Sequence, residues 1–229
     1  MYWLNPNLEK FERRVHSQLT EDGVIEKIVE TLRIQNGYYV EFGVGPRVAG
    51  SLETHGIEAN TRLLRESGWF GLWMDGQNYP SHYQVQKEFI TALNINLLLS
   101  KYKVPRDFDL ISIDIDGQDL WVWMALNASP KIVVIECNGN FDFGDSRSIP
   151  FNIDHRWDGT AYFGASVTAL QKIGRSKGYV NVWCNAINCI FVREDLLQNP
   201  ESFEPERIHK KLPRRIHRID EHNRSWVII

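Results

Sequence analysis

The feature that most constrains this chain is an alternation of short apolar runs with segments of helical periodicity. Four runs rich in β-branched and aromatic residues have the length of buried strands, and they span residues 38–44, 69–76, 108–114 and 131–136. Apolar residues at helical spacing lie between these runs. Strands that alternate with helices predict the α/β class, with a mostly parallel central sheet covered by helices on both faces.

Weaker patterns predict the remaining N-terminal elements. Residues 7–34 carry apolar positions at helical spacing with a break at residues 20–23, which predicts two amphipathic helices. Asn60 is the expected N-cap of a helix that ends at Gly68. Residues 88–92 are expected to form a short strand, and a helix should follow it before Pro105.

The C-terminal third predicts the elements that close the sheet. A helix is expected over residues 165–177, and residues 179–183 and 189–193 predict a C-terminal antiparallel strand pair. The basic run at residues 210–215 stands close to acidic residues, which indicates a solvated helical tail rather than an anion-binding patch.

Length and charge exclude several classes of protein. The chain has 229 residues and a formal net charge of −3, so it lacks the positive field that collects nucleic acid. No segment approaches the roughly 20 apolar residues of a membrane span, and the start does not read as a leader, so a cytoplasmic location is expected. We expect a single domain over 1–229, divided into N-terminal helices (1–36), an α/β core (37–193) and a tail (194–229).

The three cysteines do not form a recognisable metal-binding pattern. Cys137, Cys184 and Cys189 are odd in number, and they match no paired ligand spacing. Their neighbours are apolar or carry amides, so we expect buried thiols rather than reactive ones.

Acidic residues follow the expected strands at the edge where α/β sheets bind ligands. The residues concerned are Glu41, Asp75, Asp114, Asp116 and Glu136, with the amide of Asn138 beside the last. A carboxylate that is buried without a partner costs on the order of several kcal/mol. Each of these acids should therefore meet a hydroxyl, a backbone N–H or a metal ion.

The first strand ends in a glycine turn, Glu41-Phe42-Gly43-Val44-Gly45. Glycines at such a position let the backbone approach a ligand closely. The continuation Pro46-Arg47-Val48-Ala49-Gly50 breaks the dinucleotide fingerprint, which needs a third glycine at fixed spacing before a helix. Asp75, after the second strand, is suited to accept two hydrogen bonds from ribose hydroxyls. Together the two motifs favour an adenosine-bearing cofactor over a purely structural turn.

The motifs at the strand ends resemble those of class I S-adenosylmethionine-dependent methyltransferases, above all the FkbM-type group and related sugar O-methyltransferases. The specific part is Ser112-Ile113-Asp114-Ile115-Asp116-Gly117 together with the Ile135-Glu136-Cys137-Asn138 run. The likeness covers about residues 38–193, although the chain between Gly45 and Asn60 is longer than that pattern. Motifs at residues 41–45, 71–76, 157–166 and 188–193 also contribute to it.

The resemblance implies a Rossmann-like fold and S-adenosylmethionine as the cofactor. Glu41, Gly43 and Gly45 would line its methionine and ribose side. Asp75, followed by Gly76, would hold the ribose hydroxyls. The adenine would lie beside Thr91 and Ala92, and Asp114 would face the methyl-transfer centre; these are the cofactor-binding residues that the resemblance implies.

Oxygen atoms at two neighbouring strand ends suit a hard divalent cation, Mg²⁺ or Mn²⁺. The candidate ligands are Asp114, Asp116, Glu136 and Asn138. Some O-methyltransferases of the catechol and macrolide-sugar kinds place magnesium on similar strand ends, where it lowers the pKa of the attacking hydroxyl. In the alternative reading, Asp116-Gly117 is a turn, and Glu136 and Asn138 bind backbone N–H groups.

Candidates for a general base are His82, His155 and the carboxylates. His155 lies in a long polar loop, residues 138–160, of the kind that often covers a binding site. The alternative is an ordinary surface histidine. The catalytic set is therefore Asp114, Asp116 and His155, and Trp157 is the aromatic residue expected to touch substrate.

The expected function is transfer of a methyl group from S-adenosylmethionine to a hydroxyl of a sugar, a glycan or another small hydroxylated acceptor, with or without a divalent metal. Two alternatives stay open. One is a methyltransferase that acts on a non-sugar small molecule, and the other is a non-catalytic nucleoside-binding scaffold of the same fold. The oligomeric state does not follow from the sequence.

Overall fold

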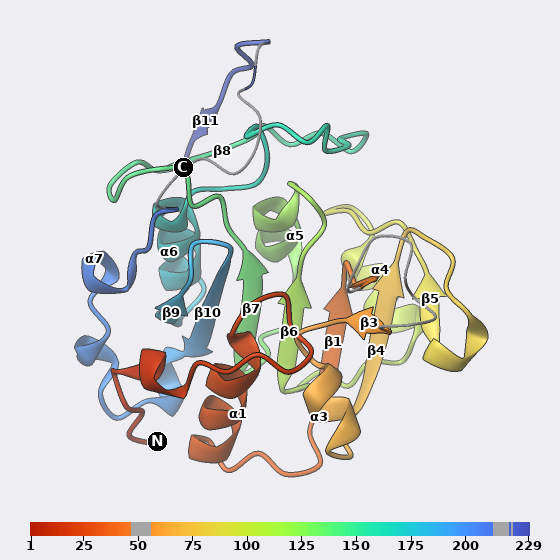
Figure 1. Ribbon diagram of the computed structural model, residues 1–229, viewed down its shortest axis with the longest axis vertical. Coiled ribbons are helices and arrows are strands. Elements are labelled where there is room, and N and C mark those ends of the chain that lie inside the picture. The colour runs from red at the N-terminus through yellow and green to blue at the C-terminus, as the bar shows by residue number, and fades with distance from the viewer. Residues whose placement is uncertain (47–55, 213–219, 221) are drawn as a thin grey trace.

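A seven-stranded sheet forms the centre of the computed structural model, which describes residues 1–46, 56–212, 220 and 222–229 (Figure 1). Its strands are β1 (Tyr38–Phe42), β4 (Phe70–Asp75), β5 (Val85–Lys87), β6 (Leu110–Ile113), β7 (Ile132–Glu136), β9 (Tyr179–Cys184) and β10 (Asn188–Arg193). Their order across the sheet is β5-β4-β1-β6-β7-β10-β9. The first five strands in this order, from β5 to β7, are parallel to their neighbours, whereas β10 is antiparallel to both β7 and β9. The predicted α/β class, with its mostly parallel sheet and C-terminal antiparallel pair, is confirmed, and the fold is Rossmann-like.

Helices cover both faces of the sheet, as predicted (Figure 1). Helices α4 (Ile95–Lys101), α5 (Asp119–Ala125) and α6 (Val167–Ser176) contact one another in succession on one face, and α1 (Glu21–Thr31) and α3 (Arg62–Glu66) lie on the other. The shorter elements are η1 (Leu8–Phe11), η2 (Ser81–Tyr83), η3 (Glu194–Leu196), η4 (Pro200–Ser202), α7 (Pro205–Ile208) and the strand pairs β2 (Gly45–Pro46) with β3 (Ile57–Glu58) and β8 (Arg147–Ser148) with β11 (Val227–Ile228).

The two central strands are buried along their length because helices cover both of their sides. All residues of β6 are buried, and in β7 only Glu136, the last, is partly exposed. This explains why the sequence shows continuous β-branched runs there instead of alternation. Trp123 fills the space between α5 and the end of the sheet, and its ring lies 4.8 Å from that of Phe191 and 5.9 Å from that of Tyr179.

The prediction of two N-terminal helices is wrong for the first of them. Only η1 and α1 form, and the residues between them are irregular. The reason is the buried carboxylate of Asp22, which accepts hydrogen bonds from the backbone N–H groups of Val15 (2.8 Å), His16 (2.9 Å) and Ser17 (2.8 Å). A side chain thus satisfies donors that a helix would pair with its own carbonyls.

Three element boundaries also differ from the predictions. Thr61, not Asn60, precedes α3, because the Asn60 side chain donates to Ser112 Oγ (3.0 Å). The third strand is β5, and residues 88–92 lie outside it because a turn begins there, where the N–H of Thr91 donates to Asn94 Oδ1 (2.8 Å). The apolar pattern predicts a helix over residues 121–126, and the corresponding helix α5 starts two residues earlier, at Asp119.

The C-terminal segment does not form the expected solvated helix within its described part. Helix α7 is a single turn of 4 residues. The side chains of Leu197, Phe203 and Ile208 are buried, and β11 pairs with β8 of the long loop. The basic run is described only as far as Leu212, because residues 213–219 lie outside the described residues.

The first residues of the chain pack against this C-terminal segment. The N–H of Tyr2 donates to the carbonyl of Leu196 (2.7 Å). The Asn199 side chain accepts from the N–H of Leu4 (3.1 Å) and donates to its carbonyl (2.9 Å), while the Leu4 side chain is fully buried. Among the described helices, none combines the length and the apolarity needed to cross a bilayer.

Candidate functional site

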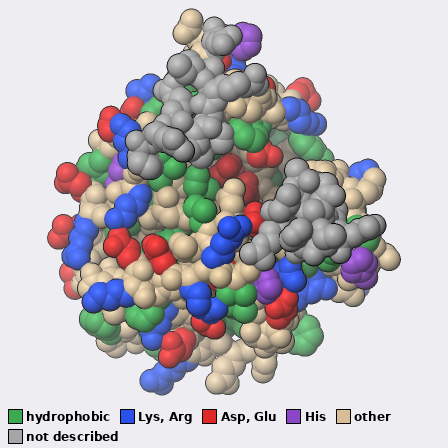
Figure 2. Space-filling view, viewed as in Figure 1, with side chains coloured by type: hydrophobic (Ala, Val, Ile, Leu, Met, Phe, Trp, Pro, Cys, Tyr) green, Lys and Arg blue, Asp and Glu red, His purple; other side chains and the backbone are tan. Residues whose placement is uncertain are grey.

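Two adjoining cavities lie beyond the carboxyl ends of the parallel strands. The larger has a volume of about 390 Å³ and the smaller about 230 Å³. They share part of their lining, namely Gly43, Asp75, Gln77, Asp114 and Asp116. We call the two together the strand-end cleft. Acidic side chains gather on the molecular surface in this region (Figure 2), and the combined space is of the size that small-molecule ligands occupy.

The turn after β1 brings the backbone to the centre of the cleft. Gly43 adopts a φ of +83°, and a Cβ atom there would lie 1.4 Å from the carbonyl oxygen of Asp114. Only glycine fits this position, because β1 and β6 approach closely. A Cβ on Gly45 would meet no atom of the described residues within 4 Å, and Gly45 lines the smaller cavity.

Glu41 has a structural task in addition to its place in the lining of the smaller cavity. One carboxylate oxygen accepts from the N–H of Asn60 (2.7 Å), and the other accepts from the N–H (2.9 Å) and the hydroxyl of Thr61. Burial raises the pKa of Glu41, and these hydrogen bonds counteract that rise. The carboxylate therefore fixes the start of α3 beside the cleft.

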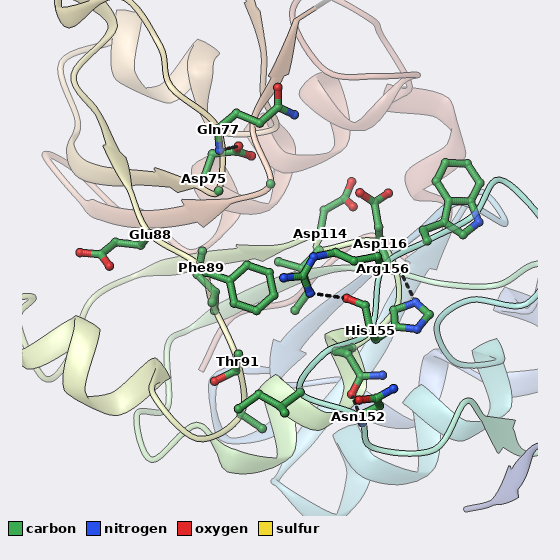
Figure 3. Close-up of a pocket in the computed structure, with 18 of the residues that line it drawn as sticks. Asp75, Gln77, Glu88, Phe89, Thr91, Asp114, Asp116, Asn152, His155 and Arg156 are labelled. Atoms are coloured by element: carbon green, nitrogen blue, oxygen red, sulfur yellow. Dashed lines mark hydrogen bonds between the residues drawn. The ribbon is translucent and has the colours of Figure 1, made fainter.

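Asp75 projects from the end of β4 toward the cleft, with Gln77 beside it (Figure 3). Its Oδ1 accepts from the N–H of Gln77 (2.7 Å). Burial raises the pKa of Asp75, and the charge of Asp116 adds to this effect. Thr91 belongs to the same lining, so the predicted cofactor residues converge. Each of them lines one or both cavities: Glu41, Gly43, Gly45, Asp75, Gly76, Thr91, Ala92 and Asp114.

Three carboxyl groups form a tight cluster at the ends of β6 and β7. Oxygen atoms of Asp114, Asp119 and Glu136 all lie within 4.8 Å of one another; we call this the carboxylate cluster. Burial, followed by repulsion between the acids, raises the pKa of Asp114 and Glu136, and burial raises that of Asp119 to about 7. Among the residues that the structure describes, no donor meets the buried Oε2 atom of Glu136. The cluster thus has room for a shared proton or a cation.

Asp119 is the member of this cluster that sequence reasoning missed. Its carboxylate accepts from the N–H groups of Ile115 (2.7 Å) and Gly117 (2.9 Å), so it holds the turn that carries Asp116. The sequence did contain a signal for Asp119, because it is a third acidic residue after Asp114 and Asp116 and stands at the start of a helix.

The other two predicted metal ligands lie elsewhere. Asp116 adopts a φ of +56°, and Gly117 adopts a φ of +137°, so this dipeptide is a turn that places the Asp116 side chain in the strand-end cleft. The Asn138 amide donates to the carbonyls of Ala161 (3.1 Å) and Phe163 (2.8 Å) and accepts from Asn140 (2.7 Å). Asn138 therefore holds the long loop, and neither residue is one of the three acids in the cluster.

His155 lines the larger cavity from the side of the long loop (Figure 3). Its Nε2 lies 3.2 Å from the carbonyl oxygen of Asp116. A carbonyl only accepts, so this hydrogen bond places the proton on Nε2 and leaves a lone pair on Nδ1. Burial lowers the pKa of His155 and keeps the ring neutral. The other predicted base, His82, contacts the neighbouring ring of Tyr83 in η2 at a tilt of 41°, and it lies outside the lining of both cavities.

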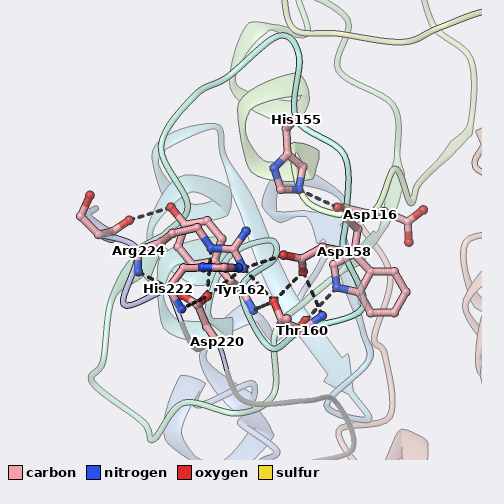
Figure 4. A network of polar contacts seen from close by, with 10 residues as sticks. Asp116, His155, Asp158, Thr160, Tyr162, Asp220, His222 and Arg224 are labelled. Carbon is pink, nitrogen blue, oxygen red and sulfur yellow. Dashed lines mark hydrogen bonds and ion pairs between the residues drawn. The ribbon is translucent and has the colours of Figure 1, made fainter.

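A C-terminal residue holds the loop that carries His155 (Figure 4). Arg224 forms an ion pair with Asp158 (2.9 Å), donates to Thr160 Oγ1 (2.9 Å) and stacks on the ring of Tyr162 at 4.1 Å. A second contact runs from the Tyr162 hydroxyl to the carbonyl of Ser225 (2.8 Å). Nothing in the local sequence indicated this pairing, because it joins segments more than 60 residues apart.

The mouth of the larger cavity has an aromatic and aliphatic rim. The Arg156 guanidinium lies 4.0 Å from the ring centre of Phe89, and the pair bridges the loop and the strand side of the cavity (Figure 3). Phe89, Phe151 and Ile153 are each more than 40% exposed and line this cavity. Trp157, the aromatic residue expected at the substrate, also lines it.

The cleft thus combines backbone that approaches closely, carboxylates and a neutral histidine around one continuous space. Comparison of the chain with family models, with curated proteins and with solved structures returned no match. Any functional assignment therefore depends on the geometry and chemistry of these residues.

Proposed function

We propose that this chain binds S-adenosylmethionine in the strand-end cleft and transfers its methyl group to a hydroxyl of a sugar, a glycan or another small acceptor. The observation that carries the proposal is the convergence of Gly43, Asp75 and Asp114 on the wall that the two cavities share. The strand order, which is methyltransferase-like, supports the same assignment.

The two cavities offer different chemistry, as the two ends of this cofactor require. In the larger one, Asp75 would accept from the ribose hydroxyls, and Thr91 with Ala92 would border the adenine. The smaller one suits the amino-acid end. There the buried Oδ1 of Asn188 meets no donor from the described part of the chain, so it is available to an ammonium group.

When bound, S-adenosylmethionine supplies a sulfonium methyl group that is already activated for transfer. The task of the chain is then mainly to align the acceptor hydroxyl with that group and to exclude water. The lone pair on His155 Nδ1 could take the hydroxyl proton, and the residue lines the larger cavity from the loop side. The exposed rim of Phe89, Phe151 and Ile153 suits the C–H faces of a sugar ring.

The same rim favours a second candidate, a non-sugar acceptor with an apolar face. The exposed side chains of Phe89 and Ile153 bury apolar area against either kind of molecule. Polar neighbours that bind ring hydroxyls would favour the sugar, and Asn152 and Gln118 supply such amides beside the rim.

The carboxylate cluster fits a divalent cation such as Mg²⁺ or Mn²⁺. Three carboxyl groups have oxygen atoms within 4.8 Å of one another, and a buried oxygen of Glu136 has no hydrogen-bond partner among the described residues; such oxygens are the hard ligands that these ions prefer. Asp114, Asp119 and Glu136 would hold the ion. It would supply positive charge that lowers the pKa of the acceptor hydroxyl, since Asp114 also lines the cleft.

The test of the cofactor is thermal denaturation with S-adenosylhomocysteine, compared with NADH. We expect a rise in the unfolding midpoint with S-adenosylhomocysteine alone, because a ligand that binds only the folded state stabilises it. Transfer is then measured with labelled S-adenosylmethionine and a panel of sugars, glycans and non-sugar alcohols. Stabilisation by NADH alone would refute the cofactor, and binding without transfer to any acceptor would favour the non-catalytic scaffold.

The test of the metal is transfer with and without a chelator, in the wild-type chain and in Asp114→Asn. We expect chelation to reduce turnover and added Mg²⁺ or Mn²⁺ to restore it in the wild type only. Transfer that is indifferent to both the chelator and the substitution would show that shared protons, not a cation, neutralise the cluster.

A further inference from the structure

A second cluster of potential ligands lies beside the carboxylate cluster and is separate from the strand-end cleft. Cys137 follows the last residue of β7, Cys184 ends β9, and Cys189 is the second residue of β10. Strand β10 lies between the other two, with Cys189 opposite Ile135 on one side and Cys184 on the other. The antiparallel pairing therefore gathers all three cysteines of the chain.

The three sulfur atoms lie within 4.8 Å of one another, and we call them the thiol cluster. Their residues are 1%, 2% and 0% exposed, as the sequence predicted, and the thiols are free. Two thiolates bound to one Zn²⁺ at about 2.3 Å in a tetrahedral site are about 3.8 Å apart. Inward shifts of about 1 Å or less would therefore bring the sulfur atoms to ligand distances.

The surroundings of Cys184 favour a thiolate. The backbone N–H of Ala186 donates to its sulfur at 3.3 Å, and Ala186 adopts a left-handed conformation with a φ of +73° to do so. The backbone N–H of Lys210 is a second donor.

A histidine with an unpaired nitrogen lies on the chain segment that covers the thiol cluster. The buried Nε2 of His209 meets no partner among the residues described. The ring makes its hydrogen bond to the backbone of Phe141 instead, which leaves Nδ1 as the donor. His209 is not a member of the group of ligand atoms that lie within 4.8 Å of one another, so its side chain must move to reach the sulfur atoms. A histidine held by one nitrogen with the other left free is the arrangement of a metal ligand.

We propose that Cys137, Cys184 and Cys189 bind one Zn²⁺ ion and that His209 Nε2 moves in as the fourth ligand. Such a site is closed to solvent and structural, and it fixes the segment after α7 to the β9–β10 pair. It is chemically distinct from the carboxylate cluster, because thiolates select soft or borderline ions and carboxylates select hard ones. The proposal does not depend on the proposed methyl transfer.

The test uses the full chain, purified under reducing conditions without added metal. We expect about one zinc ion per chain by elemental analysis. After removal of zinc under denaturing conditions and refolding, titration with Co²⁺ should give an intense sulfur-to-cobalt charge-transfer band that saturates at about one equivalent. This wild-type spectrum decides the question even if a cysteine variant fails to fold.

Variants locate the ion. Cys189→Ser should abolish the cobalt band, and His209→Ala should keep the band but weaken Co²⁺ binding at least about tenfold. His222→Ala is the matched histidine control, and Asp119→Asn is the control for the carboxylate cluster; both should give the same sulfur-to-cobalt charge-transfer band as the wild type.

Three outcomes would overturn the proposal. The first is the absence of both zinc and a charge-transfer band in the wild-type chain. The second is a disulfide between two of the cysteines in the purified protein, detected by mass spectrometry. The third is metal binding that survives Cys189→Ser and disappears in Asp119→Asn, which would place the ion in the carboxylate cluster.

Discussion

The strand-end cleft has two walls that differ in how their side chains are held. The strand wall consists of Glu41, Gly43, Asp75 and Asp114, which stand at the ends of parallel strands and are mostly buried. The loop wall consists of Asn152, His155, Arg156 and Trp157, which are partly or fully exposed.

The sheet itself positions the strand wall, whereas the loop wall depends on a contact with Arg224 in the C-terminal segment (Figure 4). A rigid wall suits a cofactor, because the same molecule binds in every reaction. A wall on a loop suits the acceptor, because loop residues can determine which acceptor is bound. We therefore expect substitutions on the strand wall to change cofactor affinity and substitutions on the loop wall to change turnover.

The largest effect should come from His155→Ala on the loop wall. Loss of a general base lowers turnover by about 10²–10⁴-fold, while the affinity for S-adenosylhomocysteine should stay within about twofold. In the wild type, burial lowers the pKa of His155, so the rate should fall on the acid side only below pH 6.5. Steady-state kinetics over pH and calorimetric binding measure both quantities. An unaltered rate would show that His155 is not the general base, and it would refute the expected difference in function between the two walls.

Asp75→Ala on the strand wall should give the next largest effect. It would remove the two charge-assisted hydrogen bonds that we propose between Asp75 and ribose, so cofactor affinity should fall about 100-fold while the fold is retained. The matched control is Glu88→Gln, since Glu88 lines the same cavity but its carboxylate pairs with Lys101 and Tyr102 (2.6 Å). Equal affinities of Asp75→Ala and the wild type for S-adenosylhomocysteine would take Asp75 out of the site.

Arg224→Ala tests whether the C-terminal segment holds the loop wall. Loss of its contacts with Asp158 and Thr160 should lower turnover about tenfold and speed proteolysis of the loop, with cofactor affinity unchanged. Because the charge of Arg224 lowers the pKa of His155, the acid limb of the pH–rate profile should also move to higher pH. Arg193→Ala, which breaks an ion pair with Asp195, is the control. If Arg224→Ala and Arg193→Ala have the same turnover and the same rate of proteolysis, the contacts of Arg224 do not hold the loop wall.

The smallest effect should be a pH dependence of stability that originates in the carboxylate cluster, which shares Asp114 with the strand wall. Burial raises the pKa of Asp119 to about 7, so between about pH 4 and 7 the folded state binds more protons than the unfolded state. The free energy of unfolding should therefore fall as pH rises from 5 to 8, by more than about 1 kcal/mol. Urea denaturation at both pH values measures this fall.

Asp119→Asn should flatten that dependence, and Asp195→Asn on the surface should not. Mg²⁺ bound in the carboxylate cluster would restore stability at pH 8. A free energy of unfolding that rises from pH 5 to 8 would show that the cluster is not protonated in the folded chain.

The sequence predicted the strand wall better than the loop wall for a physical reason. Gly43, Asp75 and Asp114 follow apolar runs, and parallel strands bring their carboxyl ends to one edge whatever the details of packing. The loop that carries His155, by contrast, is held by Arg224, which is 69 positions from His155 in the chain, and local periodicity carries no information on contacts between such distant segments.

The failures have the same origin. A loop forms in place of the first expected helix because the buried carboxylate of Asp22 accepts hydrogen bonds from the backbone there. The periodicity of apolar residues does not reveal such contacts. The thiol cluster escaped notice because spacing rules detect ligands that are close in sequence, whereas Cys137 meets Cys184 through strand pairing. Asn138 was predicted to be a metal ligand because it follows the same strand as Glu136, but its side-chain amide donates hydrogen bonds to loop carbonyls instead.

The packing of the first residues against the C-terminal segment sets an order of events during synthesis. Leu4 is fully buried only when Asn199 is present to bind its backbone, and 195 positions separate the two. At about 5–20 residues per second, a ribosome needs about 10–40 s to make the intervening chain. Throughout that time Leu4 lacks this partner, so its packing against Asn199 is among the last contacts of the described chain to form.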